Sequence, residues 1–300
     1  MSSEIILKHI VPQVEFNNIR FCDYCGGVFD GLPTKSSVKK AISRGELFIN
    51  GKPASDGRFV VSGQLIEWRR EVKVPERVFE LEVPVVYEDD YLAVVNKPAG
   101  VVVSGNRFQT LENALVEILQ PSSQPDALTM PHAIHRLDSD TSGLVIIGKT
   151  ASAHLQLSRM MAERKIQKFY SAVVIGAPPK NGTINDPIDQ KPAVTHFQTI
   201  KKYDSLVSGV LSLLQVKLET GRTHQIRKHL SAAGHPILGD KLYGQPGFVL
   251  RHRGLFLCAS QLVFDHPVTN KPIDLSIELP AKFTKFPEGE QTRFNKYRNL

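Results

Sequence analysis

The chain has 300 residues, of which 41% are hydrophobic and 22% are charged, and its formal net charge is +7. This length suits one large domain or a large and a small one, and the composition is that of a globular protein rather than a disordered or fibrous one. The sequence has no apolar run of about 18 residues, and no charged segment leading into an apolar one at its start. We therefore expect no membrane span and a cytoplasmic protein.

The positive charge is concentrated near the N-terminus. Residues 31–73 hold nine Lys or Arg and four Asp or Glu, which accounts for +5 of the whole chain's excess. A basic segment suits a polyanionic partner such as nucleic acid, but a solvated helix face has the same composition. Charge alone does not decide between these two interpretations.

The first predicted unit is small, basic and αβ. A helix is predicted over 34–45, with Thr34 as its N-cap and Gly45 at its end. The next residues predict a strand and an Asn50–Gly51 turn, a strong hairpin signal. Residues 58–70 predict a second short strand pair.

Two of the three cysteines, Cys22 and Cys25, form a CxxC motif. A structural zinc site needs four ligands, and no second CxxC or HxxxH pair follows at finger spacing. The segment also lacks the strand–helix context of a thioredoxin-like redox motif. We expect these cysteines to have no chemical role.

The larger part follows a charged linker at 71–82 and consists mostly of strands. Strict βαβ alternation is missing, so we expect an α+β fold with a mixed, mainly antiparallel sheet. We divide the chain into 1–75 and 76–300. Strands are predicted at 83–103 (two around an acidic turn and one after Gly100), 144–147, 167–176, 211–221, 257–267 and 271–280, and helices at 110–119, 151–165 and 223–235.

The densest polar stretch is HAIHRLDSDTSG, which ends at Gly143 and precedes the apolar run 144–147. A loop at the entrance of a buried strand can hold reactive groups rigidly. Turn-forming hydrogen bonds explain Asp140 and Thr141 well. They explain Arg136 and Asp138 less readily, because a charged pair at a strand entrance needs a partner.

Two other chemistries, a metal site and a serine nucleophile, are conceivable for this stretch. His132 and His135 have helical spacing, but the preceding proline and the following turn disfavour a helix, while His224 and His229 are five apart. Ser142 lacks the GxSxG context of a serine hydrolase. A metal site and a serine nucleophile are therefore both disfavoured.

The stretch LETGRTHQIRKHLSAAGHPILGDKLYG contains Arg222 and Arg227. Arginine presents forked donors that fit phosphate or carboxylate, although surface arginines have the same appearance in a sequence.

Four blocks together resemble the RluA family of RNA pseudouridine synthases. They are VVYEDDYLAVVNKPAG, HRLDSDTSG, KFYSAVVIG and the LETGRTHQIR stretch, in the family's order and approximate spacing over about residues 83–280. Residues 34–68 resemble, more loosely, the S4 RNA-binding module that often precedes this catalytic domain. The late strand reads LCA, with Cys258 where the family often has histidine.

The resemblance implies that the chain isomerises uridine within RNA, with no cofactor and no metal. By motif position Asp138 is the essential carboxylate, acting as nucleophile or as base. Tyr170 matches the KxYxA tyrosine, which stacks on the flipped uracil and assists removal of the C5 proton. Arg227 is implied to pair with Asp138 and offset the effect of burial on its ionisation.

The resemblance also implies RNA contacts. In the catalytic part these are Arg136, Lys97 and Arg222, with Lys97 interpreted as support for the pocket. In the S4-like part they are Lys35, Lys39, Lys40 and Arg44.

We expect 23S ribosomal RNA as the substrate, transfer RNA being the alternative. A protein of another class, which only binds RNA during assembly, would have the same basic N-terminal segment. We expect a monomer that requires no protein partner.

Overall fold

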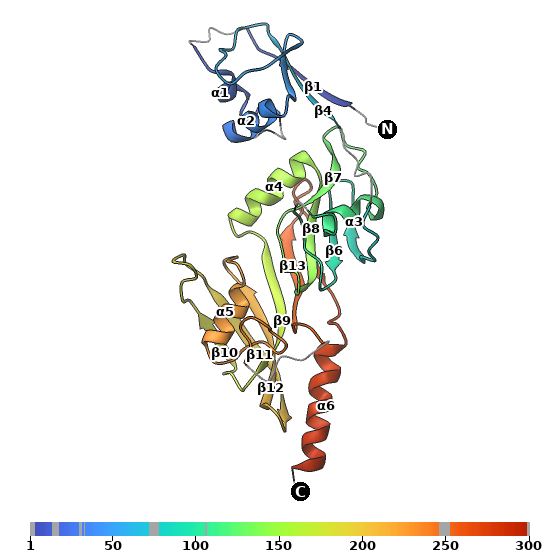
Figure 1. Ribbon diagram of the computed structural model, residues 1–300, viewed down its shortest axis with the longest axis vertical. Coiled ribbons are helices and arrows are strands. Elements are labelled where there is room, and N and C mark those ends of the chain that lie inside the picture. Colours follow the sequence, from blue (N-terminus) through green and yellow to red (C-terminus); the bar gives the residue numbers. More distant parts are fainter. Residues whose placement is uncertain are drawn as a thin grey trace.

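The computed structural model describes residues 4–13, 18–29, 32, 34–71, 78–105, 107–245 and 253–298. Its strands form two separate sheets, a small one near the N-terminus and a large one from the rest of the chain (Figure 1). Half of the expected linker, residues 72–77, lies outside the described residues, and so does the boundary between 75 and 76. No described helix is long and apolar enough to cross a membrane.

The small sheet has four strands in the order β1-β4-β2-β3. Its elements are β1 (Glu4–Ile10), α1 (Phe21–Cys25), α2 (Lys35–Ser43), β2 (Leu47–Ile49), β3 (Lys52–Pro53) and β4 (Leu65–Glu71). Buried residues of both helices and of the strands, including Cys22 and Cys25, form one core. Burial raises the pKa of both thiols to about 12, which keeps them protonated and unreactive.

The helix cap and the hairpin turn predicted in the small unit both form. Thr34 caps α2, because its Oγ1 accepts the Ser37 N–H at 3.1 Å while the Ser37 Oγ accepts the Thr34 N–H at 3.0 Å. Asn50 and Gly51 have φ angles of 49° and 76°. Two consecutive left-handed residues are what a tight turn between paired strands requires, and they join β2 to β3.

The large sheet has ten strands in the order β10-β11-β12-β9-β13-β8-β6-β5, with β14 beside β13 and β7 beside β8. The pairing of β8 with β13 is parallel, and every other pairing between the described strands is antiparallel. The expected mixed, mainly antiparallel α+β fold is confirmed. The strands are β5 (Val85–Glu88), β6 (Leu92–Lys97), β7 (Ala127–Ala133), β8 (Ser142–Thr150), β9 (Gln167–Ile175), β10 (Asn181–Ile184), β11 (Thr195–Ser205), β12 (Gly209–Leu218), β13 (Leu257–Asp265) and β14 (Pro272–Ser276).

Four helices belong to the same part of the chain. They are α3 (Leu111–Ile118), α4 (Ala151–Ala162), α5 (Gln225–Ala232) and α6 (Lys282–Tyr297). The predicted cap of α3 is confirmed, since the Thr110 Oγ1 accepts the Asn113 N–H at 3.2 Å. Helix α3 lies against β7 and α4 against β8, whereas α5 and α6 pack against β11 (Figure 1).

Two predicted strands are wrong. Residues 58–61 make only an isolated bridge to Arg20, because β4 is already paired with β1 on one edge and β2 on the other. Residues 101–103, after Gly100, likewise make an isolated bridge to Thr110 instead of a strand. Neither segment adds a strand to a sheet.

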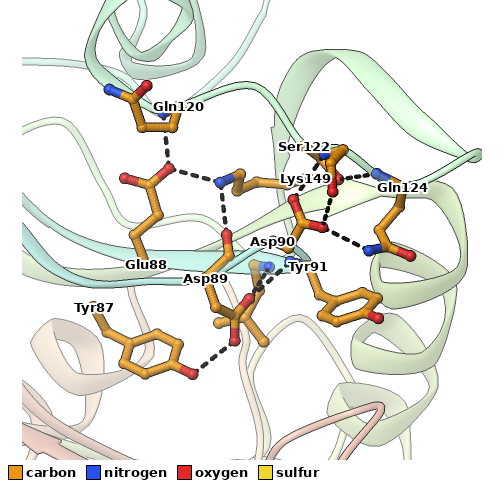
Figure 2. A network of polar contacts seen from close by, with 11 residues as sticks. Tyr87, Glu88, Asp89, Asp90, Tyr91, Gln120, Ser122, Gln124 and Lys149 are labelled. Atoms are coloured by element: carbon orange, nitrogen blue, oxygen red, sulfur yellow. Dashed lines mark hydrogen bonds and ion pairs between the residues drawn. The ribbon is translucent and has the colours of Figure 1, made fainter.

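The acidic turn predicted between β5 and β6 is a centre of hydrogen bonding (Figure 2). Asp89 accepts the Tyr91 and Leu92 N–H groups at 2.7 and 2.9 Å, and also contacts the Tyr87 hydroxyl and the His266 ring. The neighbouring Glu88 and Asp90 tie the turn to Lys149 and to residues 120–124. The carboxylates of this turn are therefore used to join β5, β6, β8 and β13, and not for chemistry.

Strand β8 positions the loop that contains Asp138. Its residues 144–147 are fully buried, as their apolar run predicts. At its start Gly143 has a φ of 118°, and a Cβ there would lie 2.2 Å from the carbonyl oxygen of Ala259 in β13. Only glycine permits this backbone and this close approach of the two parallel strands.

Replacing Gly143 by alanine should therefore destabilise the protein strongly. We expect Gly143→Ala to lower the free energy of unfolding by about 3 kcal/mol or more, because the new methyl group meets backbone that cannot move aside. Gly57→Ala is the matched control, since nothing lies within 4 Å of a Cβ at that position. Urea unfolding of both variants checks this, and equal midpoints would contradict it.

Candidate active site

A cavity of about 870 Å³ opens where the loop before β8, strand β9, the end of β12 and the start of α5 meet. Asp138, Tyr170 and Arg227 all line it. Three of the four sequence blocks that resemble the family therefore contribute residues to one cavity. The fourth block, around Lys97, contacts the loop that contains Asp138 through a hydrogen bond from the Lys97 ammonium to the Ser139 carbonyl oxygen.

Asp138 lies in the loop between β7 and β8. The loop turns back on itself through a hydrogen bond from the Thr141 N–H to the Asp138 carbonyl oxygen at 3.1 Å. The Asp138 side chain faces the cavity and keeps 22% of its surface exposed, whereas Asp140 is exposed and does not line the cavity. The hydroxyl of Thr141 is buried without a hydrogen-bond partner in the described structure, so its predicted turn bond does not form.

Arg227 sits on α5 with its guanidinium almost wholly buried. Its Nε and Nη2 donate to the two carboxylate oxygens of Asp240 at 2.8 and 2.7 Å, and its Nη1 lies 3.6 Å from the Asp138 Oδ2. The predicted partner, Asp138, is therefore the more distant of two. Burial opposes the charged form of Arg227, but the hydrogen bonds and charge of Asp240, and then the charge of Asp138, outweigh it and raise its pKa.

Asp240 is completely buried and anchors the arginine. Besides Arg227 it accepts the N–H groups of Leu242 and Tyr243 at 2.9 and 3.0 Å. Burial alone would raise the pKa of this carboxyl, but the Arg227 hydrogen bonds and the two backbone donors hold it below its ordinary value. Asp240 is thus ionised and fixed, and Arg227 with it.

Tyr170 projects from β9, which pairs with β12 and β13 on its two sides. The residue is 7% exposed yet lines the cavity, so it packs in the core and presents one part to the hollow. Burial, and then the charge of Asp138, raise the pKa of its hydroxyl. That hydroxyl stays protonated near neutral pH.

Basic side chains gather along the cavity wall. Lys168 is half-buried, and its Nζ lies 3.5 Å from the Met161 sulfur, with no carboxylate partner among the described residues. Burial lowers the pKa of this ammonium. The cationic residues of the lining are Arg136, Arg164, Lys168, Lys217, Arg222 and Arg227. Of the predicted RNA contacts, Arg136 and Arg222 lie here.

The predicted RNA contact of Lys97 is wrong. Its side chain has no exposed surface, and its ammonium donates to the carbonyl oxygens of Pro98, Val101 and Ser139 at 2.9, 2.7 and 3.1 Å. All three N–H groups are used inside the protein. Lys97 instead fastens the turn after β6 to the loop that holds Asp138, which agrees with its interpretation as support.

The four predicted cations of the N-terminal unit lie on α2 and just beyond it, all exposed, and none lines the cavity. Lys35 pairs with Asp23 at 2.6 Å, Lys39 pairs with Asp56 at 2.8 Å, and Arg44 pairs with Glu46. Exposed ion pairs are weak, so phosphate can compete for these cations. Contact of Lys35, Lys39, Lys40 and Arg44 with RNA stays a prediction.

The histidines that suggested a metal have other partners. His135 accepts the Ile146 N–H at 3.2 Å, and burial lowers its pKa to about 3, so it is neutral. His229 contacts the Thr195 hydroxyl and the Asp186 carbonyl oxygen, both at 2.9 Å. Within the described ranges, no three His, Cys, Asp or Glu residues are grouped to hold a metal ion.

Three residues of the site were not singled out in the sequence. Asp240 and Tyr243 belong to the quoted GDKLYG turn, where an aspartate three residues before a tyrosine is an ordinary turn composition. For His224 the sequence suggested only the role of a metal ligand. The structure places it at the cavity, with its Nε2 3.6 Å from the Asp138 Oδ1.

The chain is similar to known proteins in sequence and in fold. Residues 91–232 match the family model described as RNA pseudouridylate synthase. An uncharacterized RNA pseudouridine synthase of Aquifex aeolicus is 34% identical over 282 residues, which cover 83% of this chain and 87% of that protein. The ribosomal large subunit pseudouridine synthase D of Zymomonas mobilis is 36% identical over 230 residues, 67% of this chain and 70% of that one.

Among solved structures, Human RNA Pseudouridylate Synthase Domain Containing 1 is similar at 25% identity with a TM-score of 0.55, covering 66% of this chain and 84% of that chain. The sequence relatives match over most of both chains, and the family model spans the loop of Asp138, strand β9 and helix α5. The chain belongs to the RNA pseudouridine synthase family.

Proposed function

We propose that this enzyme isomerises uridine to pseudouridine in large-subunit ribosomal RNA, with Asp138 starting the reaction. The observation that carries the proposal is the Asp138 carboxylate, which faces the cavity 3.6 Å from Arg227 in a chain of this family. Relatives from several bacteria are named ribosomal large subunit pseudouridine synthase D, which supports this RNA over transfer RNA.

The reaction breaks the N1–C1′ glycosidic bond, turns the uracil and joins its C5 to C1′. A proton leaves C5 and a proton returns to N1, so the atoms balance without a co-reactant. Asp138 acts as nucleophile or as base in the first step, and both routes need the ionised carboxylate. Arg227 places a positive charge 3.6 Å from this carboxylate, and its bonds to Asp240 keep the guanidinium from moving.

Tyr170 is proposed to stack on the flipped uracil and to relay the C5 proton. Its protonated hydroxyl suits a relay rather than an ionised base. The unstacking of the uridine costs a few kcal/mol, which contacts with the aromatic ring and with backbone phosphates offset. Arg136, Lys168 and Arg222 lie along the wall where those phosphates would bind.

The N-terminal residues 1–75 are proposed to be a separate S4-like RNA-binding domain, with 76–300 as the catalytic domain. Their hydrophobic cores share no residue, which supports the division. We propose a monomer in the cytoplasm, where ribosomal RNA is modified.

The first test of the proposal is the identity of the carboxylate. Asp138→Asn should lower pseudouridine formation by about 10³-fold or more, because the amide can neither attack nor accept a proton. Release of tritium from RNA labelled at uridine C5 measures this. Asp140→Asn is the matched control and should stay active. If the wild-type protein binds RNA but releases no tritium, it is a binding protein and not an enzyme.

The RNA substrate has its own test. Pseudouridines missing from the RNA of a deletion strain, compared with its parent strain, show whether the substrate is ribosomal or transfer RNA.

The tyrosine has a separate test. Tyr170→Phe keeps the ring for stacking but removes the relaying hydroxyl, so we expect RNA affinity to stay nearly unchanged while tritium release slows about 10²-fold. Tyr203→Phe, at a buried tyrosine outside the cavity lining, should have no effect on release. Equal loss of RNA affinity and rate in Tyr170→Phe would assign the hydroxyl to binding.

The basic wall predicts a change in salt dependence. Lys168→Met removes one phosphate-binding charge, so the slope of log affinity against log salt concentration should fall by about 1. Because the lost ammonium is partly desolvated and has no carboxylate partner in the described parts of the chain, the variant should be at least as stable as wild type. Lys165→Met, three residues earlier in the connection before β9 and paired with Glu163 at 2.7 Å, should leave the slope unchanged.

A further inference from the structure

His224 has an unusual backbone conformation at the edge of the cavity. Its φ and ψ are 56° and 27°, in the left-handed region, and its side chain makes no capping hydrogen bond to α5. This conformation is unfavourable for a residue with a Cβ, and such residues persist where the surrounding structure holds them. The backbone turn directs the imidazole away from the helix and toward the loop of Asp138.

The imidazole lies between two oxygen-bearing groups. Its Nδ1 is 3.0 Å from the Tyr243 hydroxyl, and its Nε2 is 3.6 Å from the Asp138 Oδ1. If the tyrosine donates to Nδ1, the proton of the neutral ring is on Nε2 and points at the carboxylate. Tyr243 is itself fixed, because its N–H donates to Asp240 and its carbonyl oxygen accepts the Ser231 hydroxyl.

The two oxygens of Asp138 therefore face different donors. Arg227 approaches Oδ2 and His224 approaches Oδ1, each at 3.6 Å. A carboxylate with a donor at each of its two oxygens cannot rotate freely about its Cβ–Cγ bond. A single donor leaves more of this rotation open. Both distances exceed a hydrogen bond, and contacts of this kind shorten when substrate fills a site.

We infer that His224, with its tautomer set by Tyr243, is a positioning residue that orients the Asp138 carboxylate. The inference rests on the proposed function of Asp138. The other charged or titratable groups acting on Asp138 are Arg227 from α5, Lys97 from β6 and Tyr170 from β9. None of these contacts the Oδ1 side at the distance of His224.

Substitution by asparagine separates the ring from the backbone. Asparagine tolerates the left-handed conformation, so His224→Asn keeps the chain path while its short side chain reaches neither neighbour. We expect kcat for tritium release to fall about 10- to 100-fold with RNA affinity within about twofold of wild type, since a misoriented group costs rate rather than binding.

Tyr243→Phe provides a second variant that keeps the aromatic ring against the Arg227 guanidinium, 5.2 Å away. It should cause a smaller loss of the same kind, and little further loss when combined with His224→Asn. His196→Asn is the matched control, because His196 also bridges a hydroxyl and a carboxylate, Thr183 and Glu219, but does not line the cavity. It should behave as wild type.

The outcomes are distinct. If wild type releases tritium and both variants keep its kcat, the inference is wrong while the proposed function stands. If the variants lose only RNA affinity, His224 is a substrate contact and the inference is again wrong. If wild type itself releases no tritium, the proposed function fails and this inference fails with it.

Discussion

The geometry of the cavity depends on the buried ion pair between Arg227 and Asp240. Charges removed from water must be paired and hydrogen-bonded, and breaking such a pair by removing one partner typically costs about 3–5 kcal/mol. Here two side-chain bonds join the charges, and two backbone N–H groups complete the carboxylate. The pair fixes the segment after α5 against that helix. It also leaves one nitrogen of the guanidinium directed at Asp138.

The sequence predicted the fold class and most elements because their signals are local. Thr34 and Thr110 cap their helices through the residue three positions on, and Asn50–Gly51 turns the chain without help from elsewhere. The gathering of Asp138, Tyr170 and Arg227 in one cavity is different, since no periodicity connects them. It followed from the resemblance of whole blocks to a family, which encodes long-range contacts that local physics does not.

The environment of Lys97, strand β7 and helix α6 could not be predicted, because these features depend on contacts between residues far apart in the sequence. An RNA contact was predicted for Lys97, but its ammonium is buried against acceptors that include the Ser139 carbonyl oxygen, 42 residues away in the chain. Strand β7 passes through Pro131, which can lie in a strand whose local pairing is interrupted, as the register shift between Ala127 and His132 shows. Helix α6 contains Pro287 in its interior, and proline there disfavours the prediction of a helix from the sequence. Its buried Glu290 is satisfied by Ser205, far away in the chain.

Helix α5 has one further consequence. In addition to Arg227, it buries Gln225 and His229. The Gln225 amide is hydrogen-bonded to the hydroxyls of Thr195 and Thr220 and to the Val194 carbonyl oxygen, and the His229 ring contacts the Thr195 hydroxyl. Any rotation or sliding of this helix would leave several of these polar groups without partners at once, which is costly in the protein interior. The wall of the cavity that α5 forms is therefore rigid. Under the proposed function the RNA must do the bending, which favours uridines in loops and bulges, whose bases leave the stack most easily.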